Sequence, residues 1–196
     1  MPVEKFTRLV STAVPLAAEN VDTDQILPAR FLKAVIREGF GEYLFRDLRF
    51  DSAGNPLTDF PLNRPEYGGR ILVAGRNFGS GSSREHAAWA LVDYGFRAVI
   101  SSFFADIFRN NALNNGLLPV QVSGHYLNVI FQAIDRDPRV RITIDLEKQK
   151  VMLGEDICRF EINPFRKQCL LNGWDEVDYL LGIQDEIRKF EENFNL

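Results

Sequence analysis

The middle of the chain alternates short apolar runs with stretches of helical periodicity. Three runs predict buried strands: residues 70–74, 98–100 and 117–122. Two helices are predicted between them. The first has Ala87, Ala88, Leu91 and Val92 on one side and ends at Gly95, and the second covers 104–115 and ends at Gly116. Strands that alternate with helices in this way predict a parallel sheet covered by helices.

The flanking segments have other patterns. Residues 6–14 predict a first strand, 126–134 a helix, and 140–146 with 150–153 a polar-edged hairpin. The C-terminus predicts helix in two pieces broken at Gly182, and these residues supply its apolar side: Val177, Leu180, Leu181, Ile183, Ile187 and Phe190. The fold class is therefore predicted to be α/β with β-rich additions.

Two segments are predicted to be irregular. Residues 19–24 form a polar turn rich in side-chain acceptors, followed by an apolar pair and Pro28. Residues from about 37 to 69 are aromatic and interrupted by glycine and proline, which excludes long regular elements after about Phe50. We expect residues 1–196 to form a single domain in which this long loop has a function.

Composition narrows the class of protein. The 196 residues are 45% hydrophobic and 26% charged, which is typical of a globular domain and excludes a disordered chain. A net charge of −4 argues against nucleic acid as a partner. The sequence offers neither a signal peptide nor an apolar run long enough to cross a membrane, so we expect a soluble, cytoplasmic protein without a membrane partner.

The glycine-rich stretch GRNFGSGSSREHA (75–87) fits none of three familiar motifs. A phosphate-binding P-loop needs Lys after its last glycine, whereas in this chain Ser80 follows Gly79. A dinucleotide fingerprint that starts at Gly79 needs glycine at position 84, which is arginine in this chain. A nucleophile elbow centred on Ser82 needs glycine at the same position. What remains is a helix N-terminus that carries two serines and an arginine.

Two interpretations of this helix start stay open. Residues 82–85 (SSRE) match a capping box, in which Ser82 accepts from the first-turn amides and Glu85 reaches back. Alternatively, backbone amides at the glycines and the positive helix end bind an anion, and the fork of Arg84 suits a carboxylate. Amide donors around the Ser82 oxygen would then stabilise an alkoxide, which makes this serine a candidate base.

Several motifs together carry a family resemblance. They are NVDTDQILP (20–28), the stretch 75–87, FADIF (104–108) with Asn110, and GLLP (116–119), in this order. The chain resembles the swivel domain of the aconitase superfamily over nearly its whole length. As a free-standing domain with FLK (31–33) and REGFG (37–41), it is similar to the small-subunit family of bacterial 3-isopropylmalate dehydratases.

The resemblance implies a fold and a set of roles. The fold would be a swivelling β/β/α domain. Ser82 would be the base that removes a proton from carbon, and Ser83 and Arg84 would bind a substrate carboxylate. Arg37 lies in the segment that matches the family's substrate-recognition loop and would be a second carboxylate contact, although a loop arginine can also simply be solvated.

The family reaction isomerises 2-isopropylmalate and 3-isopropylmalate by dehydration to 2-isopropylmaleate and rehydration, in leucine biosynthesis. It uses a 4Fe-4S cluster held by three cysteines, whereas this chain has only Cys158 and Cys169. The resemblance therefore implies that this chain binds no cofactor or metal, and that a large subunit supplies the cluster and the acid residues. The active site would lie between the two chains.

Other residues are assigned modest roles. We expect His86 to orient or pack, His125 to lie on the surface, and Asp22 and Asp24 to position the turn without binding metal. Aromatic and apolar residues at 40–45 could close over an isopropyl group, but such residues are usually core.

The substrate and the class of function have alternatives. The same pattern occurs in small subunits of citraconate or methylmalate hydratases and of homoaconitases. The substrate is hard to assign among them, because one methyl group in a pocket changes the preference between substrates by only about 1 to 3 kcal/mol. A noncatalytic module that binds small carboxylates would keep the loop and Arg84 without needing a partner chain.

Overall fold

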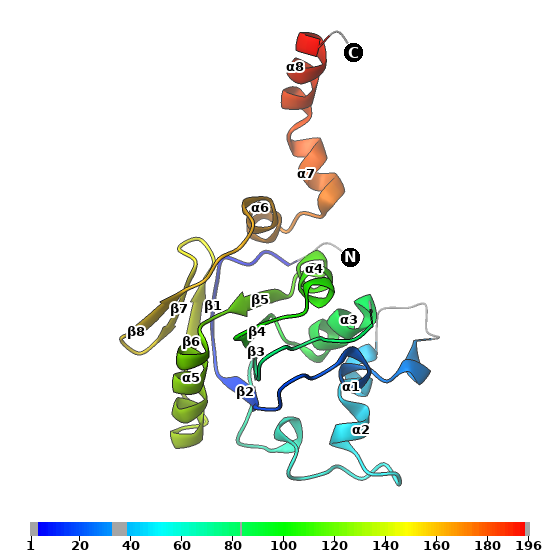
Figure 1. The fold of residues 1–196 in the computed structure, drawn as a ribbon, viewed down its shortest axis with the longest axis vertical. Coiled ribbons are helices and arrows are strands. Elements are labelled where there is room, and N and C mark those ends of the chain that lie inside the picture. The colour runs from blue at the N-terminus through cyan, green and yellow to red at the C-terminus, as the bar shows by residue number, and fades with distance from the viewer. Residues whose placement is uncertain (1–3, 33–38, 83, 195–196) are drawn as a thin grey trace.

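The structure is a computed structural model that describes residues 4–32, 39–82 and 84–194 (Figure 1). The strands are β1 Arg8–Ser11, β2 Ala13–Leu16, β3 Ile71–Ala74, β4 Ala98–Ser101, β5 Leu118–Gln121, β6 Ile142–Asp145, β7 Lys150–Leu153 and β8 Asp156–Arg159. The α-helices are α1 Thr23–Ile26, α2 Arg46–Arg49, α3 Glu85–Tyr94, α4 Asp106–Asn114, α5 Gly124–Arg136, α6 Pro164–Asn172, α7 Glu176–Gly182 and α8 Gln184–Phe194. Three short 3-10 helices cover Ala29–Phe31, Phe40–Tyr43 and Pro61–Asn63.

The predicted parallel sheet is confirmed. Its four strands follow the chain in the order β2-β3-β4-β5, and each neighbouring pair is parallel. Helices α3 and α4 connect the last three strands, as the alternating pattern predicts. The apolar runs are continuous because both faces of this sheet are covered.

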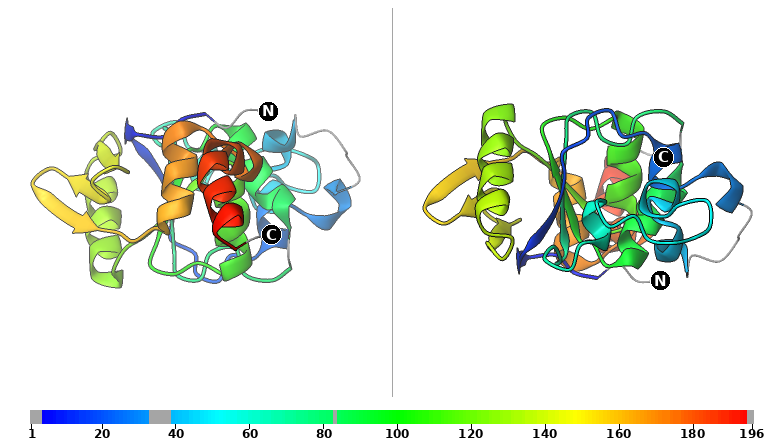
Figure 2. Two further views of the ribbon diagram at one scale, coloured as in Figure 1. Left: turned by 90° about the horizontal axis from the view of Figure 1, so that it is seen from above. Right: turned by 90° about the horizontal axis from the view of Figure 1, so that it is seen from below.

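Side chains of each strand alternate between two hydrophobic cores. Ile71 and Val73 of β3 join one core with α5 and the second sheet, whereas Leu72 and Ala74 join the other with α3, α4 and the 40–45 segment. The second sheet is antiparallel, with the order β1-β6-β7-β8. Figure 2 shows α5 and the β7–β8 hairpin on one side of the molecule and α3 on the other.

The single strand predicted over residues 6–14 is wrong. The chain forms β1, which pairs with β6 in the antiparallel sheet, and then β2, which pairs with β3 in the parallel sheet. Thr12 lies between the two strands. Burial explains the change of sheet, since β1 is exposed on one face and β2 is buried at every residue. The predicted hairpin is correct, and β8 extends it.

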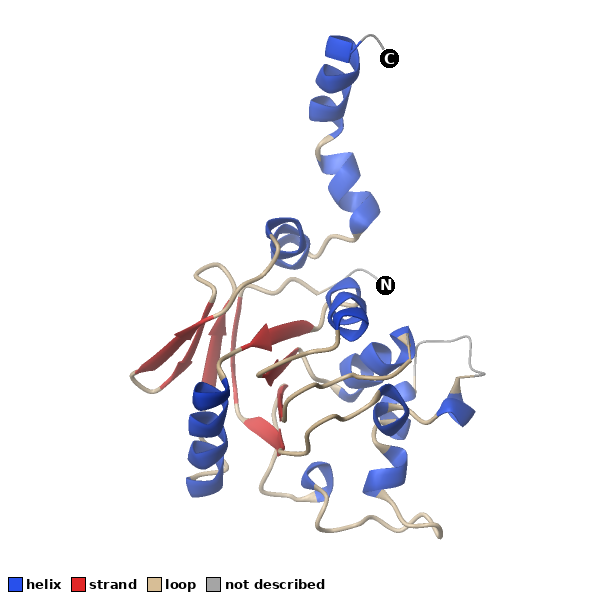
Figure 3. Ribbon diagram, viewed as in Figure 1, coloured by secondary structure: helices blue, strands red, loops and turns tan. Residues whose placement is uncertain are grey.

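The C-terminal helices separate into a packed part and a projecting part. Leu170 of α6 is buried, and its carbonyl accepts from the Phe6 amide at 2.8 Å. Helices α7 and α8, here called the C-terminal arm, extend away from the body (Figures 1 and 3). The break after Gly182 is confirmed, but the predicted apolar side does not join either core. No helix in the described part of the chain is long and apolar enough to span a membrane.

Candidate active site

The glycine-rich residues 75–82, here called the serine loop, leave the carboxyl end of β3 and lead to α3. Gly79 has φ +78°, and a Cβ built on it would lie 2.2 Å from the Cγ atom of Phe108. A Cβ on Gly75 would lie 2.3 Å from the Ala18 carbonyl oxygen. These two positions accept only glycine, because the backbone passes directly against its neighbours.

The serine loop is bonded along one side to the predicted polar turn. The Asn20 amide donates to the Arg76 carbonyl at 2.8 Å, the Gly79 amide to Val21 at 2.8 Å, and the Thr23 amide to Ser80 at 2.9 Å. Thr23 is a residue only 2% exposed, and its hydroxyl donates to the Ser82 carbonyl at 3.1 Å. The turn thus has a specific task, which is to hold the loop that carries Ser82.

The same loop is bonded on its other side to the segment before α4. The Phe78 amide donates to the Phe103 carbonyl, and the Ala105 amide donates to the Phe78 carbonyl, both at 3.1 Å. The ring of Phe78 packs edge-on against that of Phe108, with centroids 5.1 Å apart. Three segments far apart in the sequence therefore converge on one site.

Ser82 lies at the exposed end of the serine loop. Among the described residues, none accepts from the amides of Gly81 and Ser82, and none bonds the Ser82 hydroxyl. Of the two interpretations of this helix start, the capping box is wrong. Helix α3 begins at Glu85 with Arg84 as N-cap and no side-chain cap, because Thr23 holds Ser82 two positions before the N-cap. The Glu85 carboxylate instead accepts from Trp89 and Asn115.

Arg84 forms an ion pair with Asp24 of α1. The arginine side chain is 16% exposed and the aspartate side chain 56%. The guanidinium of Arg84, through its hydrogen bond, holds the pKa of the Asp24 carboxyl below its ordinary value of 3.8. Sixty positions separate the two residues, and the local sequence around Asp24 predicted only a role in the turn. Asp22 does keep that role, since it caps α1 by accepting from the Gln25 amide at 2.7 Å.

The remaining residues singled out in the sequence fall into two groups, those that the structure describes and those that it does not. Arg37 and Ser83 lie outside the described residues. His86 packs against the rings of Phe40 and Trp89, at 5.5 and 4.4 Å between centroids, and His125 is exposed in the first turn of α5. Both histidines therefore have the modest roles that the sequence predicted.

The apolar residues at 40–45 belong mainly to the core. Phe40, Leu44 and Phe45 are at most 1% exposed. Tyr43 is 36% exposed and stacks on Phe31, with centroids 4.2 Å apart. Packing therefore explains the three buried side chains, and only Tyr43 presents a surface to the solvent.

The donor set of this chain does not fit a cluster that needs three thiolates. It has two cysteines, Cys158 on β8 and the buried Cys169 in α6, and neither belongs to the serine loop. The described residues contain no group of three His, Cys, Asp or Glu side chains that could hold a metal ion. The site offers instead the Ser82 hydroxyl, two amides that have no acceptor among the described residues, and an arginine paired with the carboxylate of Asp24.

Comparisons with known proteins show which family this chain resembles. Residues 3–125 match the aconitase C-terminal domain, and residues 128–164 match the LeuD_N family. A protein of Christiangramia forsetii named 3-isopropylmalate dehydratase small subunit is 58% identical, over 97% of this chain and 94% of its own length. A protein of the same name from Cytophaga hutchinsonii is 56% identical, over 96% and 95%.

A solved structure is also similar. The crystal structure of a 3-isopropylmalate dehydratase from Methanocaldococcus jannaschii matches with a TM-score of 0.64 and 28% identity. The match covers 96% of this chain and 99% of that chain.

Proposed function

The chain belongs to the family of 3-isopropylmalate dehydratase small subunits, of the aconitase superfamily, and we propose that its serine loop with Arg84 forms one half of an active site. The family activity is that of a hydro-lyase in leucine biosynthesis, which interconverts 2-isopropylmalate and 3-isopropylmalate together with a large subunit. The observation that carries this function is the identity of 58% over 97% of the chain.

Ser82 is proposed as the base that takes a proton from substrate carbon. Its hydroxyl is exposed and unbonded among the described residues, which leaves the oxygen open to a ligand. The amides of Gly81 and Ser82, which have no acceptor in the described part of the chain, support stabilisation of negative charge, and the ten-residue helix α3 begins three positions after Ser82. Because a serine hydroxyl is a weak base unaided, this stabilisation is what the role requires.

Arg84 is proposed to bind a substrate carboxylate. Its pairing with Asp24 supports this role, since the guanidinium already holds a carboxylate at the edge of the site. Asp24 then positions the guanidinium and shares it with the substrate. Ser83 and Arg37, which lie outside the described residues, are proposed as further substrate contacts.

The large subunit is proposed to bring the 4Fe-4S cluster and the acid. The support is the donor set of this chain, which has two cysteines on separate elements and two histidines that pack or lie on the surface. We place the complex in the cytoplasm, where a reducing environment keeps such cysteines as thiols. The chain is proposed to act as a single swivelling domain, with its long loop at about 37–69 over the substrate.

Anaerobic reconstitution with the large subunit tests the substrate. The complex is offered 2-isopropylmalate, citrate, homocitrate and 2-methylmalate, and turnover is followed by absorbance of the unsaturated intermediate. We expect the highest kcat/KM for 2-isopropylmalate. A higher value for one of the others would move the protein to a related hydro-lyase, and no turnover with any of them would leave a carboxylate-binding module.

A further inference from the structure

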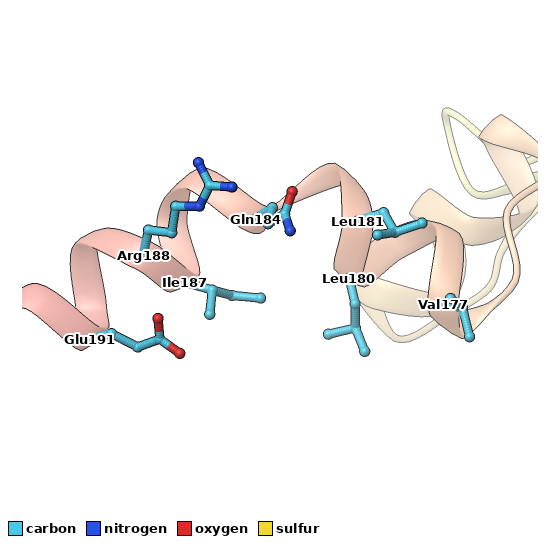
Figure 4. A pocket seen from close by; sticks show the side chains of 7 residues that line it. All are labelled: Val177, Leu180, Leu181, Gln184, Ile187, Arg188 and Glu191. Atoms are coloured by element: carbon cyan, nitrogen blue, oxygen red, sulfur yellow. The ribbon is translucent and has the colours of Figure 1, made fainter. Parts of the chain in front are cut away.

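The C-terminal arm exposes apolar side chains that neither core uses. Val177, Leu180 and Leu181 of α7 are 63%, 54% and 61% exposed. With Ile187 of α8 they line a concavity of about 330 Å³ at the bend between the two helices. Figure 4 shows Val177 and Leu180 projecting to the same side of α7, with Ile187 directed from α8 toward the space beside Leu180. Contiguous exposed apolar surface of this kind marks an interaction site.

Two contacts in the described part of the chain hold α7 near the body. Tyr179 packs edge-on against Phe165 of α6, with centroids 4.6 Å apart, and Gly182 lies against Trp174. Beyond residue 171, no described residue belongs to either core. Helices of seven and eleven residues are marginal in water when nothing packs on them. A partner that covers the apolar side would therefore stabilise both helices.

The charge of the arm narrows the choice of partner. Residues 175–196 contain seven acidic and two basic residues, a net charge of −5. Because the whole chain carries −4, residues 1–174 carry +1. A second copy would bring another −5 against the first, and anionic lipid would be repelled as well. The complementary surface is an apolar groove of a protein rimmed by Lys and Arg, which receives a helix.

The arm is also shared with proteins named as small subunits. The two family matches end at residue 164, before the arm begins. The similarity to the Christiangramia forsetii protein nevertheless covers 97% of this chain, so it extends into the arm. Because the arm is present in relatives that are named small subunits, we expect it to have a function that small subunits share.

We propose that the C-terminal arm docks its apolar side into a basic-rimmed groove of the large subunit, as a contact separate from the Ser82 site. This inference rests on the proposed function, which supplies the partner. The arm would act as a tether, holding the two subunits together while the serine loop faces the shared substrate.

The test measures the affinity of the full chain for the large subunit. The variant Leu180→Glu/Ile187→Glu places two carboxylates on the apolar side. Lys189→Glu is the matched control, because it changes the net charge by the same two units at a position that does not line the concavity. We expect Kd to rise at least tenfold in the double variant and less than threefold in the control. The kcat of the saturated complex should stay within twofold of wild type in both.

A chain that lacks residues 183–196 gives a second measurement, since the described residues of this range, 183–194, belong to neither core. Its Kd should also rise at least tenfold, with an unchanged melting temperature. A wild-type Kd in both arm variants would overturn the inference. It would be overturned in the same way if Kd is unchanged and sedimentation shows that the variants alter self-association of the chain. A wild-type pair that forms no complex, or a complex without isopropylmalate turnover, would overturn the proposed function itself.

Discussion

The serine loop and the C-terminal arm differ in how the rest of the chain holds them. Backbone bonds to residues 20–23 and 103–105 fix the serine loop on two sides, whereas ring and glycine contacts at its base attach the arm. The loop presents polar groups and the arm an apolar side. A site that binds a small ligand requires groups fixed to within about half an ångström, while a helix that docks in a groove requires mainly an exposed apolar side. The two regions therefore meet different demands of one two-chain enzyme.

The largest expected effect tests how rigid the serine loop is. Gly79→Ala should cost about 2 to 5 kcal/mol of unfolding free energy, because a positive φ and contact with Phe108 both oppose a Cβ. Gly154→Ala is the control, since Gly154 has φ +60° and nothing within 4 Å of its Cβ position. It should cost only about 1 to 2 kcal/mol. Equal costs in urea denaturation would mean that the loop relaxes easily.

A second variant separates chemistry from stability at Ser82. In the reconstituted complex, Ser82→Ala should lower turnover at least about a hundredfold, because a proton-transferring group is lost. The free energy of unfolding should change by less than about 0.5 kcal/mol, since Ser82 is exposed and does not cap α3. Ser82→Asn is run beside it as a size control with the same expectation. Near wild-type turnover in both variants would remove Ser82 from the chemistry.

A third variant tests the geometry of the anion contact. Arg84→Lys should raise the KM for 2-isopropylmalate about tenfold, because an ammonium cannot form two parallel bonds to a carboxylate. Arg76→Lys, on the exposed part of the same loop, should leave the KM within twofold. If the two variants behave alike in steady-state kinetics, the fork of Arg84 has no special part in binding.

The smallest effect is the pH dependence of the Asp24–Arg84 pair. The pKa of Asp24 is lower in the folded chain than its ordinary value of 3.8, so the pair stabilises the fold above that pH. This contribution is lost as the pH falls through the folded pKa. Because Asp24 is exposed, Asp24→Asn should cost at most about 1 kcal/mol at pH 7. Denaturation at pH 7 and pH 3 should show the difference shrinking, and a constant difference would contradict the assignment.

The sequence predicts the sheet better than it predicts the site. Runs such as ILVA at β3, with helices ending at Gly95, identify the parallel sheet because local pattern and burial agree. The strand over 6–14 fails because the chain changes sheets at Thr12. The local sign of that crossing is the change from the mixed run RLVS, which is partly exposed, to the apolar run AVPL, which is buried throughout.

At the site, the local pattern favours an incorrect cap. Residues 82–85 read as a capping box, but the bond from Thr23 that holds Ser82 outside the helix comes from a residue 59 positions away. The pairing of Arg84 with Asp24 is equally nonlocal. Four of the six residues predicted for the apolar side of the arm line its concavity, yet helical periodicity gives no information about what covers that side.

Turnover of 2-isopropylmalate by each subunit alone and by the mixture tests the claim of a divided active site most directly. The chain should show no turnover alone, and activity should rise with added large subunit until it saturates at a fixed ratio of the two. Turnover by the isolated chain, in a preparation free of the partner, would contradict the account.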